Sequence, residues 1–100
     1  MELNELQKKA DEIIDKIDEK LNCSHDINST ILHLIEELGE VSRELNKPNI
    51  RNEDIDKEEL GDEIADVFLL LLRIANLNDI NLEESIKRKI EKLNKRHGFV

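Results

Sequence analysis

Residues 59–75 constrain the fold of this chain most, because they contain an apolar run that one side of a helix cannot hold. Six consecutive apolar residues occupy positions 67–72. At about 100° per residue these positions reach every side of a helix, and a helix that is apolar all round must be buried on all sides. A chain of 100 residues can scarcely surround one of its own helices completely. The run therefore predicts self-association, as a dimer or a dimer of dimers.

The composition favours helices over strands. Charged residues make up 39% of the chain and aromatic residues 2%, with one proline and three glycines. Such a chain has too few β-branched and aromatic clusters for a sheet, while its 38% of apolar residues, regularly spaced, argue against disorder. The length suits a single domain over residues 1–100. We therefore expect one all-α domain.

Four segments have apolar residues at three- and four-residue steps, which predicts four helices. The expected helices cover residues 2–21, 27–45, 57–77 and about 82–96. Pro48 should end the second helix, because proline disfavours the helical conformation of the residue before it. Residues 49–55 are expected to form a polar loop. Four helices with short connections are typical of a four-helix bundle.

The overall charge and the chain's apolar content exclude several classes of partner. A net charge of −9 argues against a nucleic acid polymer or an anionic membrane surface, because phosphate binding needs a basic footprint. The apolar run is too short to span a bilayer, and the charged, amphipathic N-terminal segment is unlike a signal peptide. The single cysteine, Cys23, can form neither an intramolecular disulfide nor a thiolate metal site. We expect a cytoplasmic protein without a membrane partner.

Two pairs of carboxylates at three-residue spacing lie on helices that should be neighbours. Glu37 and Glu40 share one helix surface, and Glu63 and Asp66 share a surface at the head of the apolar helix. A short connection favours antiparallel packing of these helices, which would bring the pairs together. Carboxylate oxygens suit Mg²⁺, with Mn²⁺ as a possible substitute, and such a site favours attack of water on a phosphoryl group. The alternative is a set of ordinary solvated acids, since the chain has 24 of them.

The positions of these acids resemble a known family signature. Residues 36–40 read EELGE, and after 22 further residues positions 63–66 read EIAD. This pattern is similar to the EExxE…ExxD motif of the MazG-like, all-α nucleotide pyrophosphohydrolases, and the likeness extends over roughly residues 25–98. The resemblance implies a MazG-like four-helix bundle that assembles into oligomers. It also implies Mg²⁺-dependent hydrolysis of a nucleoside triphosphate to the monophosphate and pyrophosphate, as in nucleotide-pool cleaning.

The resemblance also assigns roles to individual residues. It implies that the metal ligands are Glu37, Glu40, Glu63 and Asp66. It makes Glu36 and Glu37 catalytic, with Glu36 in an outer shell or positioning the attacking water. Four residues would contact the substrate, namely His25, Lys89, Asn94 and Arg96. Because the chain has no Trp or Tyr to stack on a base, and carries Leu70 where some relatives place Tyr, the preferred base stays open.

Two other functions remain open at this stage. A related enzyme acting on another pyrophosphate-containing metabolite, such as a phosphoribosyl compound, would have nearly the same metal site. A non-catalytic helical oligomerisation module would explain the amphipathic helices and the apolar run, but not Glu63 and Asp66 beside apolar positions. A di-iron carboxylate bundle is set aside, because such sites use Glu-x-x-His pairs and no histidine here lies three residues after a glutamate.

Overall fold

The computed structural model describes residues 1–99, and all of their regular structure is helical, as the sequence predicted. The four long helices confirm the expected segments to within one residue. They are α1 (Leu3–Leu21), α2 (Ile27–Leu45), α4 (Lys57–Leu77) and α5 (Leu82–Arg96). A fifth, short helix, α3 (Lys47–Ile50), lies where a helix end and a loop were expected. Pro48 falls in its first turn, where the missing N–H has no partner to lose.

Side chains of Asp and Asn begin three of the long helices. Asp26 accepts a hydrogen bond from the backbone N–H of Ser29 at the start of α2. Asp56 caps α4 and Asn81 caps α5 in the same manner. These caps satisfy backbone donors that the first helical turn leaves free, so the sequence itself determines where each helix starts.

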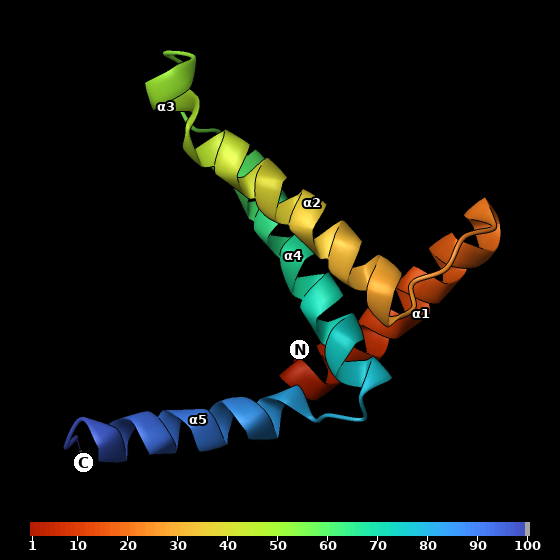
Figure 1. Cartoon of the computed structure of the whole chain (residues 1–100), viewed down its shortest axis with the longest axis vertical. Helices are drawn as coiled ribbons and strands as arrows, with labels where there is room; N and C mark the ends of the chain where they lie inside the picture. The colour runs from red at the N-terminus through yellow and green to blue at the C-terminus, as the bar shows by residue number, and fades with distance from the viewer. Residues whose placement is uncertain (100) are drawn as a thin grey trace.

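The helices α2 and α4 lie side by side and run in opposite directions (Figure 1). The last turn of α2 is joined to the start of α4 through Glu44, which is only 3% exposed. Its carboxylate accepts hydrogen bonds from the ammonium group of Lys47 at 2.7 Å and from the backbone N–H of Asp56 at 3.0 Å. The hydrogen bond from Lys47 holds the pKa of Glu44 below its ordinary value. The expected antiparallel arrangement is therefore present and is closed at its α3 end.

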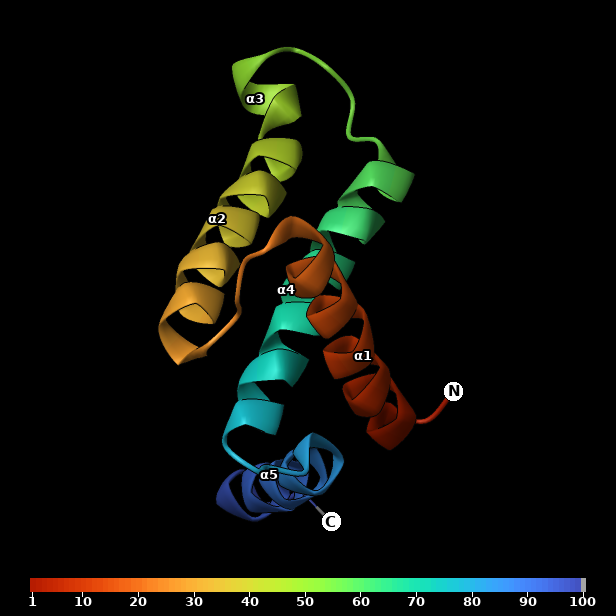
Figure 2. The ribbon, with the colours of Figure 1, turned by 90° about the vertical axis from the view of Figure 1, so that its right-hand side faces the viewer.

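The helix α1 crosses α4 near the opposite end of this pair (Figure 2). The small buried core lies at this crossing and consists of Ala10, Ile14, Leu70, Leu72 and Ala75. Arg73 ties the crossing together, because its guanidinium contacts Asp11 at 2.9 Å and Asp15 at 3.0 Å on α1. The same guanidinium donates to the backbone carbonyl of His25 at 3.1 Å. One α4 side chain thus holds both α1 and the loop that follows it.

The turn between α4 and α5 is fastened to α1 by Gln7. The side-chain amide of Gln7 donates to the carbonyl of Ile80 at 2.5 Å and accepts from the N–H of Leu82 at 3.1 Å. The backbone carbonyl of Gln7 accepts from Asn76 at 2.8 Å. We call these contacts the Gln7 clamp. The clamp holds the first turn of α5 on α1.

Beyond its first turns, α5 projects away from the other helices (Figure 1). The radius of gyration is 16.4 Å, whereas a compact chain of this length has about 13 Å. The expected four-helix bundle is therefore not confirmed by the single chain, in which α5 extends away from the other three long helices. The apolar run is also only partly covered, since Leu70 and Leu72 are buried but Leu71 is 42% exposed. Among residues 1–99, the helices lack the combination of length and apolar character needed to cross a lipid bilayer.

Candidate metal centre

Three of the four carboxylates that were expected to meet converge between the antiparallel helices. Glu37 of α2 and Glu63 and Asp66 of α4 each offer one oxygen, and these three oxygens lie within 4.8 Å of one another. Glu37 and Glu63 are half-buried, while Asp66 is exposed. We call these residues the acid trio. The three-residue spacing places Glu63 and Asp66 on the α4 surface that faces α2.

The electrostatics of the acid trio favour a bound cation. Desolvation raises the pKa of Glu63, and the charges of Glu37, Glu40 and Asp66 raise it further. A negative charge on Glu63 is thus disfavoured by its surroundings, and a divalent cation would remove that penalty. Carboxylate oxygens are the ligands that Mg²⁺ and Mn²⁺ prefer, and three of them leave coordination positions for water and phosphate. The donor set therefore fits such an ion.

The two other acids of the first motif lie at the edge of this cluster. Glu40 accepts a hydrogen bond from Arg43 at 3.1 Å, and its carboxylate is not among the three converging oxygens. Its charge nevertheless contributes to the raised pKa of Glu63. Glu36 is exposed on α2 and makes no polar side-chain contact with any residue of the described chain. The structure thus brings three of the four expected ligands together.

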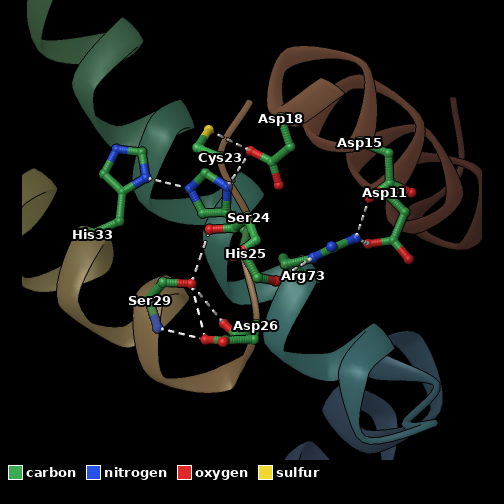
Figure 3. Close-up of polar contacts among 10 residues, drawn as sticks. All are labelled: Asp11, Asp15, Asp18, Cys23, Ser24, His25, Asp26, Ser29, His33 and Arg73. Atoms are coloured by element: carbon green, nitrogen blue, oxygen red, sulfur yellow. Dashed lines mark hydrogen bonds and ion pairs between the residues drawn. The ribbon is translucent and has the colours of Figure 1, made fainter. Parts of the chain in front are cut away.

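A line of hydrogen bonds runs from Glu37 back to α1. His33 Nε2 lies 3.1 Å from Glu37 Oε1, and His33 Nδ1 lies 2.9 Å from His25 Nε2. His25 Nδ1 in turn lies 2.7 Å from Oδ1 of Asp18, which also accepts from the thiol of Cys23 at 3.2 Å. Figure 3 shows the part of this line from His33 to Asp18. We call Asp18, His25, His33 and Glu37 the histidine line.

The donors along the histidine line can be counted. Carboxylates only accept hydrogen bonds when ionised, so His25 Nδ1 and His33 Nε2 both donate to them. One of the two inner nitrogens must donate to the other. With Asp18 and Glu37 ionised, each of the three links of the line then has a donor and an acceptor. Burial opposes ionisation of Asp18, but hydrogen bonds from His25 and Cys23 outweigh it and lower the pKa of Asp18.

Sequence reasoning missed Asp18 and His33 as site residues. His33 lies four residues before Glu37, and side chains at this spacing are neighbours on a helix surface, so a signal was present. Asp18 had no such signal, because its contact with His25 depends on how the loop after α1 turns back. Asn22 makes that turn possible by adopting a left-handed conformation with φ 54°, which asparagine tolerates.

A cavity of about 200 Å³ opens beside the acid trio. The histidines of the line and two members of the trio, Glu37 and Asp66, form its polar side. Its apolar side consists of Ile13, Ile14 and Ile17 of α1 and Leu69 and Leu70 of α4. The cavity is therefore a place where a small apolar or aromatic group could lie next to a cation.

The expected substrate contacts are separated in the structure. His25 lines the cavity, but both of its ring nitrogens are engaged by protein groups. Lys89, Asn94 and Arg96 lie on the part of α5 that projects away from α2 and α4 (Figure 1). Within one chain the structure does not bring these three residues to the acid trio.

A match to a protein-family model identifies the family of this chain. Residues 25–100 match the family described as the MazG nucleotide pyrophosphohydrolase domain. The chain belongs to the MazG nucleotide pyrophosphohydrolase family. This confirms the resemblance of the two acidic motifs to the MazG family. MazG proteins generally depend on a divalent metal, which agrees with the acid trio.

Other comparisons add less about activity. The chain is 46% identical over 68 residues to the uncharacterized protein YpjD of Bacillus subtilis (strain 168), over 63% of this chain and 60% of that protein. The chain thus spans about 60% of the length of this relative. No solved structure matches this chain. The MazG match begins at residue 25, so α1, which supplies Asp18 and the three cavity isoleucines, lies outside the matched segment.

Proposed function

We propose that the protein hydrolyses nucleoside triphosphates, ribo or deoxyribo, to the monophosphate and pyrophosphate with Mg²⁺, for which Mn²⁺ can substitute. The observation that carries this proposal is the convergence of the acid trio at the positions of the MazG signature. One oxygen of each of these three carboxylates lies within 4.8 Å of the others, and such a cluster of like charges is relieved when a cation binds to it. Cleaning of the cytoplasmic nucleotide pool is the role we expect.

In this proposal Glu37, Glu63 and Asp66 hold the cation. Glu40 joins them by leaving Arg43, because an ion pair between exposed side chains contributes little. When bound, the cation neutralises phosphate charge and activates water. Glu36, exposed beside Glu37, orients the water that attacks the α-phosphorus, and pyrophosphate leaves. The cavity beside the trio receives the nucleoside.

We further propose that the active unit is a homo-oligomer, a dimer or a dimer of dimers. Large apolar side chains remain exposed along α2 and α5, among them Ile31, Ile35, Leu38, Ile86 and Ile90. The exposed part of α5 is also basic, and the acid trio has no lysine or arginine hydrogen-bonded to it among the described residues. A second copy would cover the apolar faces and bring its Lys89, Asn94 and Arg96 to the phosphates.

A product analysis tests the reaction. The purified protein is incubated with Mg²⁺ and each common NTP and dNTP, and monophosphate, diphosphate, pyrophosphate and phosphate are resolved. Monophosphate with pyrophosphate, lost in Glu37→Gln and kept in the matched surface variant Glu19→Gln, supports the proposal. Diphosphate with phosphate would contradict the cleavage position. No turnover, together with no thermal response to millimolar Mg²⁺ or Mn²⁺, would instead favour a helical oligomerisation module.

The lining of the cavity favours a second candidate substrate. Apart from the rings of His25 and His33, its lining residues are aliphatic or acidic, so no Trp or Tyr can stack on a base there. A pyrophosphate-containing metabolite without a base, such as a phosphoribosyl compound, would not need that stacking. The same product analysis with such compounds separates the two candidates by their relative kcat/KM.

A further inference from the structure

We propose that Asp18, His25 and His33 are positioning residues for the carboxylate of Glu37, and that α1 thereby sets the metal affinity of the site. This inference rests on the proposed function, since it concerns the same cation. The acid trio lies on α2 and α4 alone. The histidine line adds a third helix, one that lies outside the segment matching the MazG family.

The first link of the line fixes the ligand itself. A glutamate side chain has three torsions, and a ligand that is free to rotate loses that freedom when it binds a cation. His33 Nε2 donates to Oε1 of Glu37 at 3.1 Å, and the other carboxylate oxygen remains available. Hydrogen bonds of this kind orient ligating carboxylates in metal sites. His33 therefore favours one rotamer of Glu37 before the cation arrives.

The second link fixes His33, which would otherwise be mobile. The side chain of His33 is 40% exposed and has little packing to hold it. His25 Nε2 lies 2.9 Å from its Nδ1, and the two rings are 5.1 Å apart between centroids. His25 is well placed to act as a support, because its side chain is only 15% exposed and its backbone carbonyl is held by Arg73.

The third link anchors the line on α1. Asp18 is buried, and its Oδ1 accepts from His25 Nδ1 at 2.7 Å, the shortest link of the line. Because an ionised carboxylate only accepts, Asp18 requires a hydrogen on His25 Nδ1 and fixes the orientation of that ring. Asp18 has no hydrogen bond to the acid trio among the described residues, and its hydrogen-bonded connection to Glu37 runs through the two histidines.

Calorimetric titration with Mn²⁺ alone tests this inference. We expect His33→Ala to raise the dissociation constant about 10- to 100-fold, the range seen when outer-shell partners are removed. Asp18→Asn should raise it by a smaller factor, and the matched variant Glu19→Gln, which removes the neighbouring charge on α1, should leave it unchanged. The double variant Asp18→Asn/His33→Ala should bind no more weakly than His33→Ala, because both changes break one line.

Further variants separate positioning from general stability. His33→Gln restores an N–H donor at this position and should recover part of the affinity. Urea midpoints of the metal-free proteins show whether stability has changed, and His97→Ala is the control for loss of an imidazole. If Asp18→Asn does not fold, His25→Ala, a change in a loop, breaks the same line and should weaken Mn²⁺ binding.

The outcomes are distinct. If the wild-type protein does not bind Mn²⁺ at millimolar concentration, the proposed metal site is wrong and the inference falls with it. If the wild type binds and His33→Ala binds equally well, the inference alone is wrong. If His33→Ala weakens binding while Asp18→Asn and His25→Ala behave like Glu19→Gln, α1 has no part in setting the affinity.

Discussion

Glu37 and Glu63 face each other from α2 and α4, and desolvation together with the charge of Glu37 raises the pKa of Glu63. The packing of α2 against α4 therefore holds two mutually repelling carboxylates close together. The pair of Glu44 and Lys47 at the α3 end of the same helix pair has the opposite character, because it is stabilised by its own hydrogen bond at 2.7 Å. The repulsion near the middle of α2 and α4 marks where a cation is expected to bind.

Replacing Glu63 should stabilise the metal-free protein and abolish its metal response. In Glu63→Gln the repulsion with Glu37 and Asp66 is lost, so the melting temperature without metal should rise by a few degrees. Millimolar Mn²⁺ should raise the melting temperature of the wild type but not of this variant. Thermal unfolding with and without Mn²⁺ measures both effects. A variant that melts lower than the wild type without metal would contradict the repulsion.

The stability of the metal-free protein should depend on pH in two opposite ways. Glu63 has a raised native pKa, so the native state binds more protons than the unfolded state, and stability falls as the pH rises from about 4.5 through that pKa. Glu44 and Asp18 have lowered native pKa values, so they add to the free energy of unfolding at pH values above their unfolded pKa values. This added stability is lost as the pH falls through their native pKa values.

Urea midpoints between pH 3 and pH 8 test these directions. Glu63→Gln should remove the decline above about pH 4.5 and leave the acid-side loss unchanged. If the wild type and Glu63→Gln have parallel profiles above that pH, Glu63 is not the group responsible.

Removing the Gln7 clamp should free α5. Gln7→Ala leaves the carbonyl of Ile80 and the N–H of Leu82 without their partner, which should cost about 1–3 kcal/mol. Hydrogen exchange should accelerate along α5 more than along α2. Asn4→Ala is the matched control, because Asn4 also bonds to α5, through Glu83, but in an exposed position. Equal effects of the two variants would mean that the clamp has no special role.

Two neighbouring leucines of the apolar run should respond differently to a charge. Leu71 is 42% exposed within one chain, so Leu71→Asp should dissociate the oligomer and leave a helical protomer. Leu72 is fully buried, so Leu72→Asp should abolish folding, because it buries an unpaired charge. Light scattering gives the mass and circular dichroism gives the helicity. An unchanged mass for Leu71→Asp would place the interface elsewhere.

Mixing two inactive variants tests whether α5 acts on a second copy. Glu37→Gln lacks a metal ligand, and the double variant Lys89→Gln/Arg96→Gln lacks the proposed phosphate contacts. If those contacts come from the partner, a mixed oligomer contains one complete site, and activity should return on mixing after brief unfolding and refolding. If the contacts come from the same chain, every site in the mixture lacks one component and no activity returns.

The helices and the acid trio followed from local features of the sequence. Apolar spacing located the four long helices, and in the structure Asp26, Asp56 and Asn81 cap the starts of three of them. The trio followed from two carboxylate pairs at three-residue spacing on helices joined by a short segment. The helix positions are confirmed because each depends on the local sequence of one helix. The convergence of three of the four acids depends on one pair of adjacent helices, and their role as metal ligands stays a prediction.

The features that sequence reasoning missed depend on several elements at once. The histidine line needs α1, the loop after it and α2 to meet, and its geometry depends on the left-handed Asn22. The direction of α5 depends on the Gln7 clamp, in which Gln7 bonds to Ile80, 73 residues later in the chain. The helix α3 was missed because Pro48, treated as a helix terminator, also suits the first turn of a new helix.

The two attachments of α1 lie near its opposite ends. Gln7 holds the start of α5, and Asp18 supports the histidine line. A helix of 19 residues is a stiff rod of about 28 Å, so a tilt that displaces one end also displaces the other. In the proposed oligomer, a tilt of α1 about its contact with Arg73 of α4 would therefore change both the position of α5 on the second copy and the orientation of Glu37 toward a cation.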